Sequence, residues 1–329
     1  MTRSLRGPFC YPHTRICFII HLVESPIRND QLNTPVAPVK KKRNRLLKAF
    51  VWSLTGAVVA LGVAYGANSL YLYLNYNQHF YVNGMSMYPT INLNGTRKSA
   101  EGTRPLYWDD GSSLNGDQID YGLGKTIKKE DVISSIARND IVITYYPRDY
   151  ETDGSGEYRR DSGGNLILKQ TATIKIKRVV ALPKERMEYR LVAPSEDESD
   201  TLSPIYGQTK IINDENPNGF YLKPLYKASS FAATPSSSVY PYPYHTYAWA
   251  KEAKEYNLDL GQDEYIVAGD NRGCSSDSLS DRFVVKAEMI IGKAYLLVGR
   301  CEFISSSSGN HVNIDYSYTF MPWNYRELH

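Results

Sequence analysis

The stretch "TIKIKRVVALP", Thr173 to Pro183, carries the clearest strand pattern in the chain. Its apolar and basic residues alternate, which places Ile174 and Ile176 on one face of a strand and Lys175 and Lys177 on the other. Taken alone, the segment is most simply a half-exposed strand with a solvated lysine face. A buried lysine is the second interpretation, and the alternation does not distinguish between the two lysines.

Similar short runs on both sides of this stretch predict a mainly β domain. The candidate strands are "HFYVNG", "DIVITYY", "NLILKQ", "EYIVAGD" and "IIGKAYLLVG", and Gly, Pro, Asn, Asp and Ser separate them. Two polar stretches, at about residues 97–139 and 194–263, are predicted to be insertions. The second is long enough to form a subdomain of its own.

A long uncharged segment precedes this domain. "FVWSLTGAVVALGVAYGANSLYLYL", Phe50 to Leu74, contains no Asp, Glu, Lys or Arg, and as a helix it would reach about 37 Å, enough to cross a hydrocarbon core of about 30 Å. A cleaved signal peptide is less favoured, because its apolar region is usually only about 7 to 15 residues long. A buried core helix is the remaining alternative.

The basic cluster "KKKRNRLLK", Lys40 to Lys48, lies only on the N-terminal side of that segment. The positive-inside rule therefore predicts a cytoplasmic tail over residues 1–48, a transmembrane helix over residues 49–75 and an extracytoplasmic domain over residues 76–329. We expect a single-pass protein of the cell membrane.

Composition excludes some functions. The chain of 329 residues has a net charge of only +3, without a basic stripe, so nucleic-acid binding is not expected. The sequence has no C-x-x-C motif that would indicate a metal site. Cys274 and Cys301 both follow the uncharged segment; a disulfide between them is permitted outside the cell, but spacing does not establish it.

A serine placed just after the predicted membrane helix raises the question of a nucleophile. Ser86 stands in "NGMSMYPTI", without a G-x-S-x-G motif or a histidine in a triad-like setting. The remaining base is a lysine, whose pKa would have to fall from about 10.4 toward neutrality. The loop "AGDNRGCSSDS", residues 268–278, is rich in hydroxyl and carboxylate groups that can fix a buried lysine.

In this order and after a membrane anchor, these stretches resemble the type I signal peptidases, membrane-bound serine proteases with a Ser/Lys dyad. The matching segments are Ser86 to Thr90, Asp140 to Val142, Lys177 to Pro183 and Gly269 to Ser278. The resemblance implies a signal-peptidase-like β ectodomain. It also selects Lys177 over Lys175.

The resemblance further implies a role for each matching residue. Ser86 would be the nucleophile, Lys177 the general base and Ser275 the hydroxyl that orients the lysine nitrogen. Asp277 would brace its loop through an arginine. Because Leu279 stands where the family usually has that arginine, Asp277 would need Arg178, Arg272 or Arg282 as its partner. Asp270 is expected as a further supporting residue.

Met87 and Ile141 are predicted to line shallow pockets for small substrate side chains, and no metal or cofactor is expected. The implied partners are the signal peptides of exported preproteins, membrane lipid and the Sec translocon. One alternative is a relative specialised as an assembly chaperone or a dedicated peptidase for surface-fibre proteins. A non-catalytic chaperone should lack the dyad, whereas Ser86 and Lys177 are both present. A self-cleaving Ser/Lys repressor is disfavoured by the anchor.

Overall fold

A computed structural model describes most of the chain outside the N-terminal tail. The described residues are 42–100, 102–106, 114–192, 206–222, 255–271, 275–307, 309–315 and 325–328. The predictions for residues 1–41, for Arg272 and for Cys274 lie outside the described residues.

The apolar segment forms one helix, α1 (Lys42–Asn75), which ends where the predicted transmembrane helix ends and begins earlier, within the basic cluster. Its part Arg45–Asn75 is long and apolar enough to cross a membrane. Large apolar side chains on it are exposed, including Trp52 at 75% and Leu61 at 67%. Apolar surface of this kind is costly in water and suits lipid. The chain divides into the units Met1–Gly56 and Ala57–His329, and the described residues of the first unit all belong to α1.

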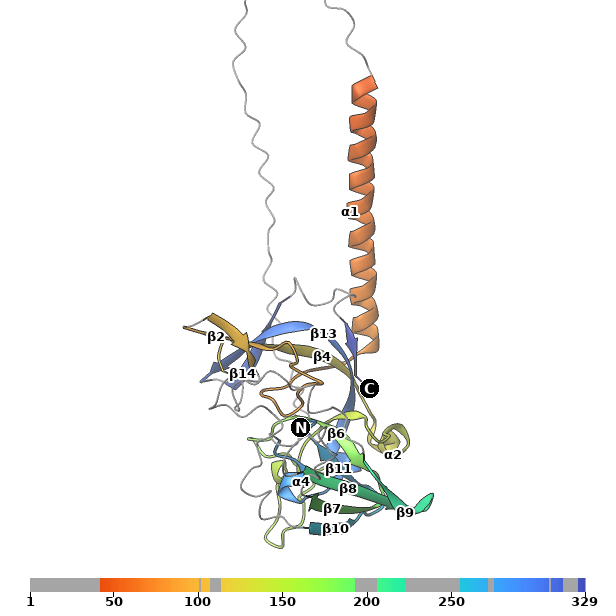
Figure 1. Ribbon diagram of the computed structural model, residues 1–329, viewed down its shortest axis with the longest axis vertical. Coiled ribbons are helices and arrows are strands. Elements are labelled where there is room, and N and C mark those ends of the chain that lie inside the picture. The colour runs from red at the N-terminus through yellow and green to blue at the C-terminus, as the bar shows by residue number, and fades with distance from the viewer. Residues whose placement is uncertain are drawn as a thin grey trace, which may run out of the picture. The chain divides into compact units, whose positions relative to one another are not determined.

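The remaining elements are mostly strands, as predicted, and Figure 1 shows their arrangement. The strands are β1 (Gln78–Tyr81), β2 (Thr96–Ser99), β3 (Gly102–Pro105), β4 (Gln118–Thr126), β5 (Ile141–Thr144), β6 (Lys175–Ala181), β7 (Arg186–Val192), β8 (Tyr206–Asn213), β9 (Asn216–Tyr221), β10 (Glu255–Asp259), β11 (Glu264–Ala268), β12 (Val285–Lys286), β13 (Ile290–Ser306), β14 (Gly309–Ile314) and β15 (Arg326–Glu327). The short helices are α2 (Val132–Ser135), α4 (Ser278–Asp281) and the 3₁₀ turns Lys129–Asp131, Pro147–Asp149 and Ala287–Met289.

The strands form two sheets. The larger has 11 strands in the order β12-β11-β6-β5-β13-β4-β2-β3, with β1 paired to β4 and with β14 and β15 paired to β13. The smaller has the order β10-β7-β8-β9, and its strands lie together in Figure 1. β6 lies between β5 and β11 in the larger sheet, so the strand that carries the candidate lysine is internal.

The internal position of β6 overturns the simpler reading of its sequence. Ile174, just before the strand, is exposed at 48% and Lys175 is half-buried, whereas Ile176 and Lys177 are buried at 4% and 5%. Alternation predicts a solvated face only where one face of a sheet meets water, and from Ile176 to Ala181 residues on both faces are buried. The lysine side chain is therefore held away from solvent.

The first predicted insertion contains a strand of the larger sheet. Residues 97–139 contain β4, which pairs with β13 along its whole length and buries Ile119 and Leu123 in the core. The stretch "QIDYGLGKT" hides this role, because its two glycines and its charged residues break the alternating pattern. Gly122 is needed here, because a Cβ atom would lie 2.2 Å from the ring of Phe80.

The second predicted insertion contains three of the four strands of the smaller sheet. β7 pairs with β8 and β10, and β9 pairs with β8. Met187 and Ile211 are fully buried in an apolar cluster shared with the end of β6. The predicted strand "NLILKQ" instead forms isolated bridges, at Leu166 and Leu168.

The sequence left open whether Cys301 forms a disulfide. Cys301 is a buried free thiol whose Sγ lies 3.7 Å from the carbonyl oxygen of Ile119. Burial, and secondarily the nearby Asp120, raises the pKa of this thiol to about 12.

Candidate active site

Ser86 lies in a turn that follows β1 and is half-buried. Met85, at 1% exposed, and Met87, at 0%, anchor the turn in separate apolar clusters on either side of the serine. The Ser86 backbone N–H donates to no group among the described residues. The turn therefore presents both a hydroxyl and a backbone donor.

The structure brings Lys177 to this serine. Its Nζ lies 2.9 Å from Ser86 Oγ and 3.1 Å from the carbonyl oxygen of Ile176. The two side chains come from elements 91 residues apart in the sequence. Their meeting depends on the register of β6, in which Lys177 stands opposite Val142 of β5.

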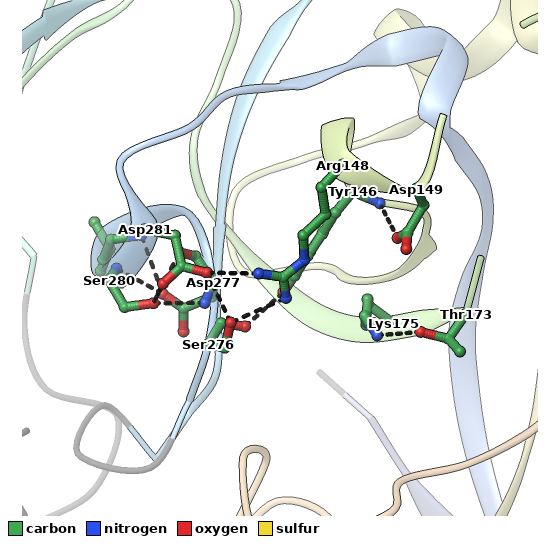
Figure 2. A network of polar contacts seen from close by, with 10 residues as sticks. Tyr146, Arg148, Asp149, Thr173, Lys175, Ser276, Asp277, Ser280 and Asp281 are labelled. Carbon is green, nitrogen blue, oxygen red and sulfur yellow. Dashed lines mark hydrogen bonds and ion pairs between the residues drawn. The ribbon is translucent and has the colours of Figure 1, made fainter. Parts of the chain in front are cut away.

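Lys175, the other lysine that the sequence offered, points elsewhere. Its Nζ contacts Thr173 Oγ1 (Figure 2). The same nitrogen lies 5.9 Å from the centre of the Tyr146 ring. Burial lowers the pKa of Lys175, while Asp149 opposes that shift. Of the two lysines, only Lys177 contacts the Ser86 hydroxyl.

The end of β11 approaches the serine turn very closely. The backbone N–H of Asn271 donates to the carbonyl oxygen of Ser86 at 3.1 Å. A Cβ atom on Gly269 would lie 2.3 Å from that same oxygen and 2.3 Å from Ser275 Oγ. Only glycine permits this contact, since real Cβ atoms essentially never approach below 3.0 Å.

Ser275 is near the site but does not make the predicted hydrogen bond. It is 3% exposed, and its Oγ has no hydrogen-bond partner among the described residues. The hydroxyl packs against Gly269 rather than reaching Lys177. The side-chain amide of Asn271 is also buried without a partner within this part of the structure.

Arg178 pairs with Asp270, not with Asp277. Its Nε and Nη2 donate to the two oxygens of the Asp270 carboxylate, each at 2.8 Å, and both side chains are nearly fully buried. Thr90 Oγ1 donates to the same carboxylate. This forked ion pair links three segments: the serine turn, the lysine strand and the end of β11.

Asp277 braces its loop through the backbone. The carboxylate, 2% exposed, accepts hydrogen bonds from the N–H groups of Gly269 at 2.7 Å, Leu279 at 3.0 Å and Ser280 at 3.2 Å. The last two make it the N-cap of α4. Leu279 cannot replace the family's arginine as an ion-pair partner, and it packs into an apolar cluster with Val180 and Ile266.

A second brace, which the sequence did not single out, holds the same loop from β5 (Figure 2). Tyr146 donates to the carbonyl oxygen of Ser276 at 3.0 Å. Arg148 donates to Ser276 Oγ and pairs with Asp281, each at 3.1 Å. The sequence feature that could have indicated this brace is "YYPRD", in which Pro147 starts a turn directly after a buried strand.

The two predicted pocket residues lie beside the site but not on its surface. Met87 and Ile141 are 0% and 1% exposed and belong to one apolar cluster, together with Ile176. They support the serine turn and the strands around the lysine. Their side chains are closed off from solvent by the described residues. No group of described His, Cys, Asp and Glu residues is arranged to hold a metal ion.

Comparison with known proteins identifies a family. A family model described as "Signal peptidase, peptidase S26" matches residues 54–298, which include the last part of α1 and all the site residues described above. No curated protein matches the chain.

Proposed function

Because the chain belongs to the S26 family of signal peptidases, we propose that Ser86 is its nucleophile and Lys177 its general base. Membership makes it a serine peptidase of the signal-peptidase type, and α1 gives it a membrane anchor. The proposal concerns the residues that perform the cleavage. The observation that carries it is the 2.9 Å contact between Lys177 Nζ and Ser86 Oγ.

In the proposed reaction, Ser86 Oγ attacks the scissile carbonyl of a signal peptide while the neutral amine of Lys177 takes the hydroxyl proton. The resulting ammonium then gives that proton to the leaving amine, and water hydrolyses the acyl-enzyme with the lysine again acting as base. Burial of Lys177 to 5% exposure supports this role, because desolvation disfavours a charged ammonium.

The backbone N–H of Ser86 is the proposed donor to the oxyanion. It is not engaged by any described residue, and a donor of this type contributes about 3 to 4 kcal/mol in comparable acyl-transfer sites. The carbonyl oxygen of Met85 lies in the same peptide plane as this N–H and accepts a hydrogen bond from the Tyr88 N–H at 3.1 Å. That bond helps to fix the direction of the Ser86 N–H.

We propose that the tail before α1 lies in the cytoplasm and the β domain lies outside, where it cleaves exported preproteins. The last turn of α1 supports a site close to the membrane, since Leu72 is buried in the same apolar cluster as Met85, next to Ser86. A signal peptide is itself in the bilayer, so tethering would raise its effective concentration at the site. Membrane lipid and the Sec translocon are the proposed surroundings.

Cleavage of a synthetic precursor with an Ala-x-Ala site tests the dyad, using the full chain in detergent or vesicles. Ser86→Ala and Lys177→Ala should each abolish processing, whereas Lys175→Ala should leave it largely intact. Processing that survives either of the first two changes would refute the assignment. A wild-type protein that binds precursor without cutting it would instead favour the assembly chaperone.

The pH dependence gives an independent check. Activity should rise with pH as the Lys177 ammonium loses its proton, because only the neutral amine can act as base. The rise should be present in kcat/KM for the free enzyme. A rate that stays constant from acid to alkaline pH would contradict a lysine base.

A further inference from the structure

The turn that carries Ser86 is held from both sides by one buried asparagine. Asn92 is 0% exposed and has a left-handed backbone with φ of 68°. Its Nδ2 donates to the carbonyl oxygens of Val82 at 3.0 Å and Gly84 at 2.9 Å, on the strand side of the serine. The asparagine itself lies on the other side, so its amide ties the two ends of the turn together.

Asp120 on β4 fixes that asparagine. The N–H of Asn92 donates to Asp120 Oδ2 at 2.6 Å, and the N–H of Asp120 donates to Asn92 Oδ1 at 2.9 Å. These bonds use the remaining acceptor of the Asn92 amide. Asn92, and with it the end of the serine turn, is thus fixed to the core strand β4 and not to a loop.

Arg326 on β15 completes the frame. Its Nη2 donates to the carbonyl oxygen of Thr90 at 2.6 Å and to Asp120 Oδ2 at 3.2 Å. Burial raises the pKa of Asp120, while Arg326 is the largest influence that lowers it, followed by Asn92 and Arg300. The arginine therefore helps to keep the carboxylate ionised so that it can accept these bonds.

Thr90 joins this frame to the lysine strand. Its carbonyl oxygen accepts a hydrogen bond from Arg326, and its Oγ1 donates to the Asp270 carboxylate. That carboxylate pairs with Arg178, the residue next to Lys177. The positions of Ser86 and Lys177 are thereby connected by a continuous set of polar contacts. Arg326 of β15 stands at the end of that set, and Leu328, just after β15, packs into the same apolar cluster as Met87.

We infer that Arg326, together with the Asn92 and Asp120 pair, positions the Ser86 turn so that its hydroxyl stays within reach of Lys177. These are positioning residues that act through the turn, and none of them contacts the reacting atoms. The inference rests on the proposed function, since it assigns a purpose to the 2.9 Å contact of the dyad. It also makes the segment around β15 part of the active-site frame.

The test compares Arg326→Met, Arg326→Lys and Asp120→Asn in the full chain, with cleavage kinetics on an Ala-x-Ala precursor. A displacement of about 1 Å at a reacting atom costs about 100-fold in rate, so Arg326→Met should lower kcat about 10- to 100-fold with KM changed less than about twofold. Arg326→Lys should be intermediate, because it keeps the positive charge beside Asp120 but its side chain is shorter and places the nitrogen differently from Nη2. Asp120→Asn should resemble Arg326→Met.

Arg159→Met is the matched control. It removes an arginine that pairs with Glu151 at 2.7 Å on the surface, outside the serine turn, and it should leave kcat unchanged. Amide hydrogen exchange supplies a readout independent of activity. In Arg326→Met, exchange should rise in residues 82–92 and not in β7 or β8.

The outcomes separate the two proposals. Wild-type cleavage that is lost in Ser86→Ala but retained in Arg326→Met, with unchanged exchange over residues 82–92, would overturn the positioning role alone. A wild-type chain that does not cleave would overturn the proposed function, and the exchange measurement would still decide whether Arg326 holds the turn. If kcat fell only in proportion to the fraction of folded protein, and fell equally in Arg326→Met and Arg159→Met, the positioning role of Arg326 would also be contradicted.

Discussion

Gly269 provides the sharpest test of how the site is assembled. In Gly269→Ala, the new methyl group would have to move from 2.3 Å to at least 3.0 Å away from both the Ser86 carbonyl oxygen and Ser275 Oγ. The first of these atoms belongs to the backbone and is also held by Asn271. The serine turn must therefore shift by most of an ångström, away from the end of β11.

A shift of that size should separate Ser86 Oγ from Lys177. We expect kcat to fall about 100-fold, equivalent to about 2.7 kcal/mol of activation free energy. Overpacking should lower the free energy of unfolding by about 1 to 3 kcal/mol. Precursor cleavage measures the first quantity, and thermal unfolding of the same preparation measures the second.

Gly154→Ala is the control for the loss of a glycine. A Cβ atom there meets nothing within 4 Å, and the residue has no positive φ. This variant should cleave precursor at the wild-type rate. If Gly269→Ala also remained within threefold of wild type while fully folded, the close approach of β11 to the serine turn would be wrong.

Three further changes test the supports of the site. Arg178→Met should lower the free energy of unfolding by about 3 to 5 kcal/mol, because it leaves the Asp270 carboxylate buried without its partner; chemical denaturation should show a smaller loss for the double variant with Asp270→Asn, and an additive loss would contradict the pairing. Tyr146→Phe should cost about 0.5 to 1.5 kcal/mol by the same measurement, since it removes one hydrogen bond to the loop before α4, and no change would discount that brace. The pKa of Glu288 is lowered to about 2, chiefly by Arg160, so its stabilisation is complete above its ordinary pKa and is lost as the pH falls toward 2. Between pH 5 and 2 the free energy of unfolding should therefore fall by about 1 to 2 kcal/mol less in Glu288→Gln than in the wild type, after allowance for solvent screening. An identical fall in the two proteins would refute the ion pair.

Much of the fold could be predicted from local patterns. The uncharged run predicted α1, and β-branched runs predicted β5, β6, β11 and the first part of β13. β4 escaped prediction because its glycines serve close packing, at Gly122 against Phe80, and a residue without a side chain contributes nothing to an alternating pattern.

The candidate site shows the same division. The resemblance placed Ser86 beside Lys177, although the strand pattern alone left Lys175 equally eligible. It did not predict that Ser275 would lack the lysine contact or that Asp277 would be satisfied by backbone N–H groups. Hydrogen-bond partners are chosen by distances of tenths of an ångström, and residue type does not encode these.

The sequence by itself determined the anchor, the mainly β class and the order of the motifs, because each of these follows from residues that are neighbours in the chain. The resemblance selected Lys177, but only the tertiary structure shows how this lysine meets the serine and what holds the two together. Lys177 reaches Ser86 because β6 is internal and in register with β5, and Arg326 reaches Thr90 from 236 residues away. Contacts between such distant segments depend on the packing of the whole sheet, which no local pattern records.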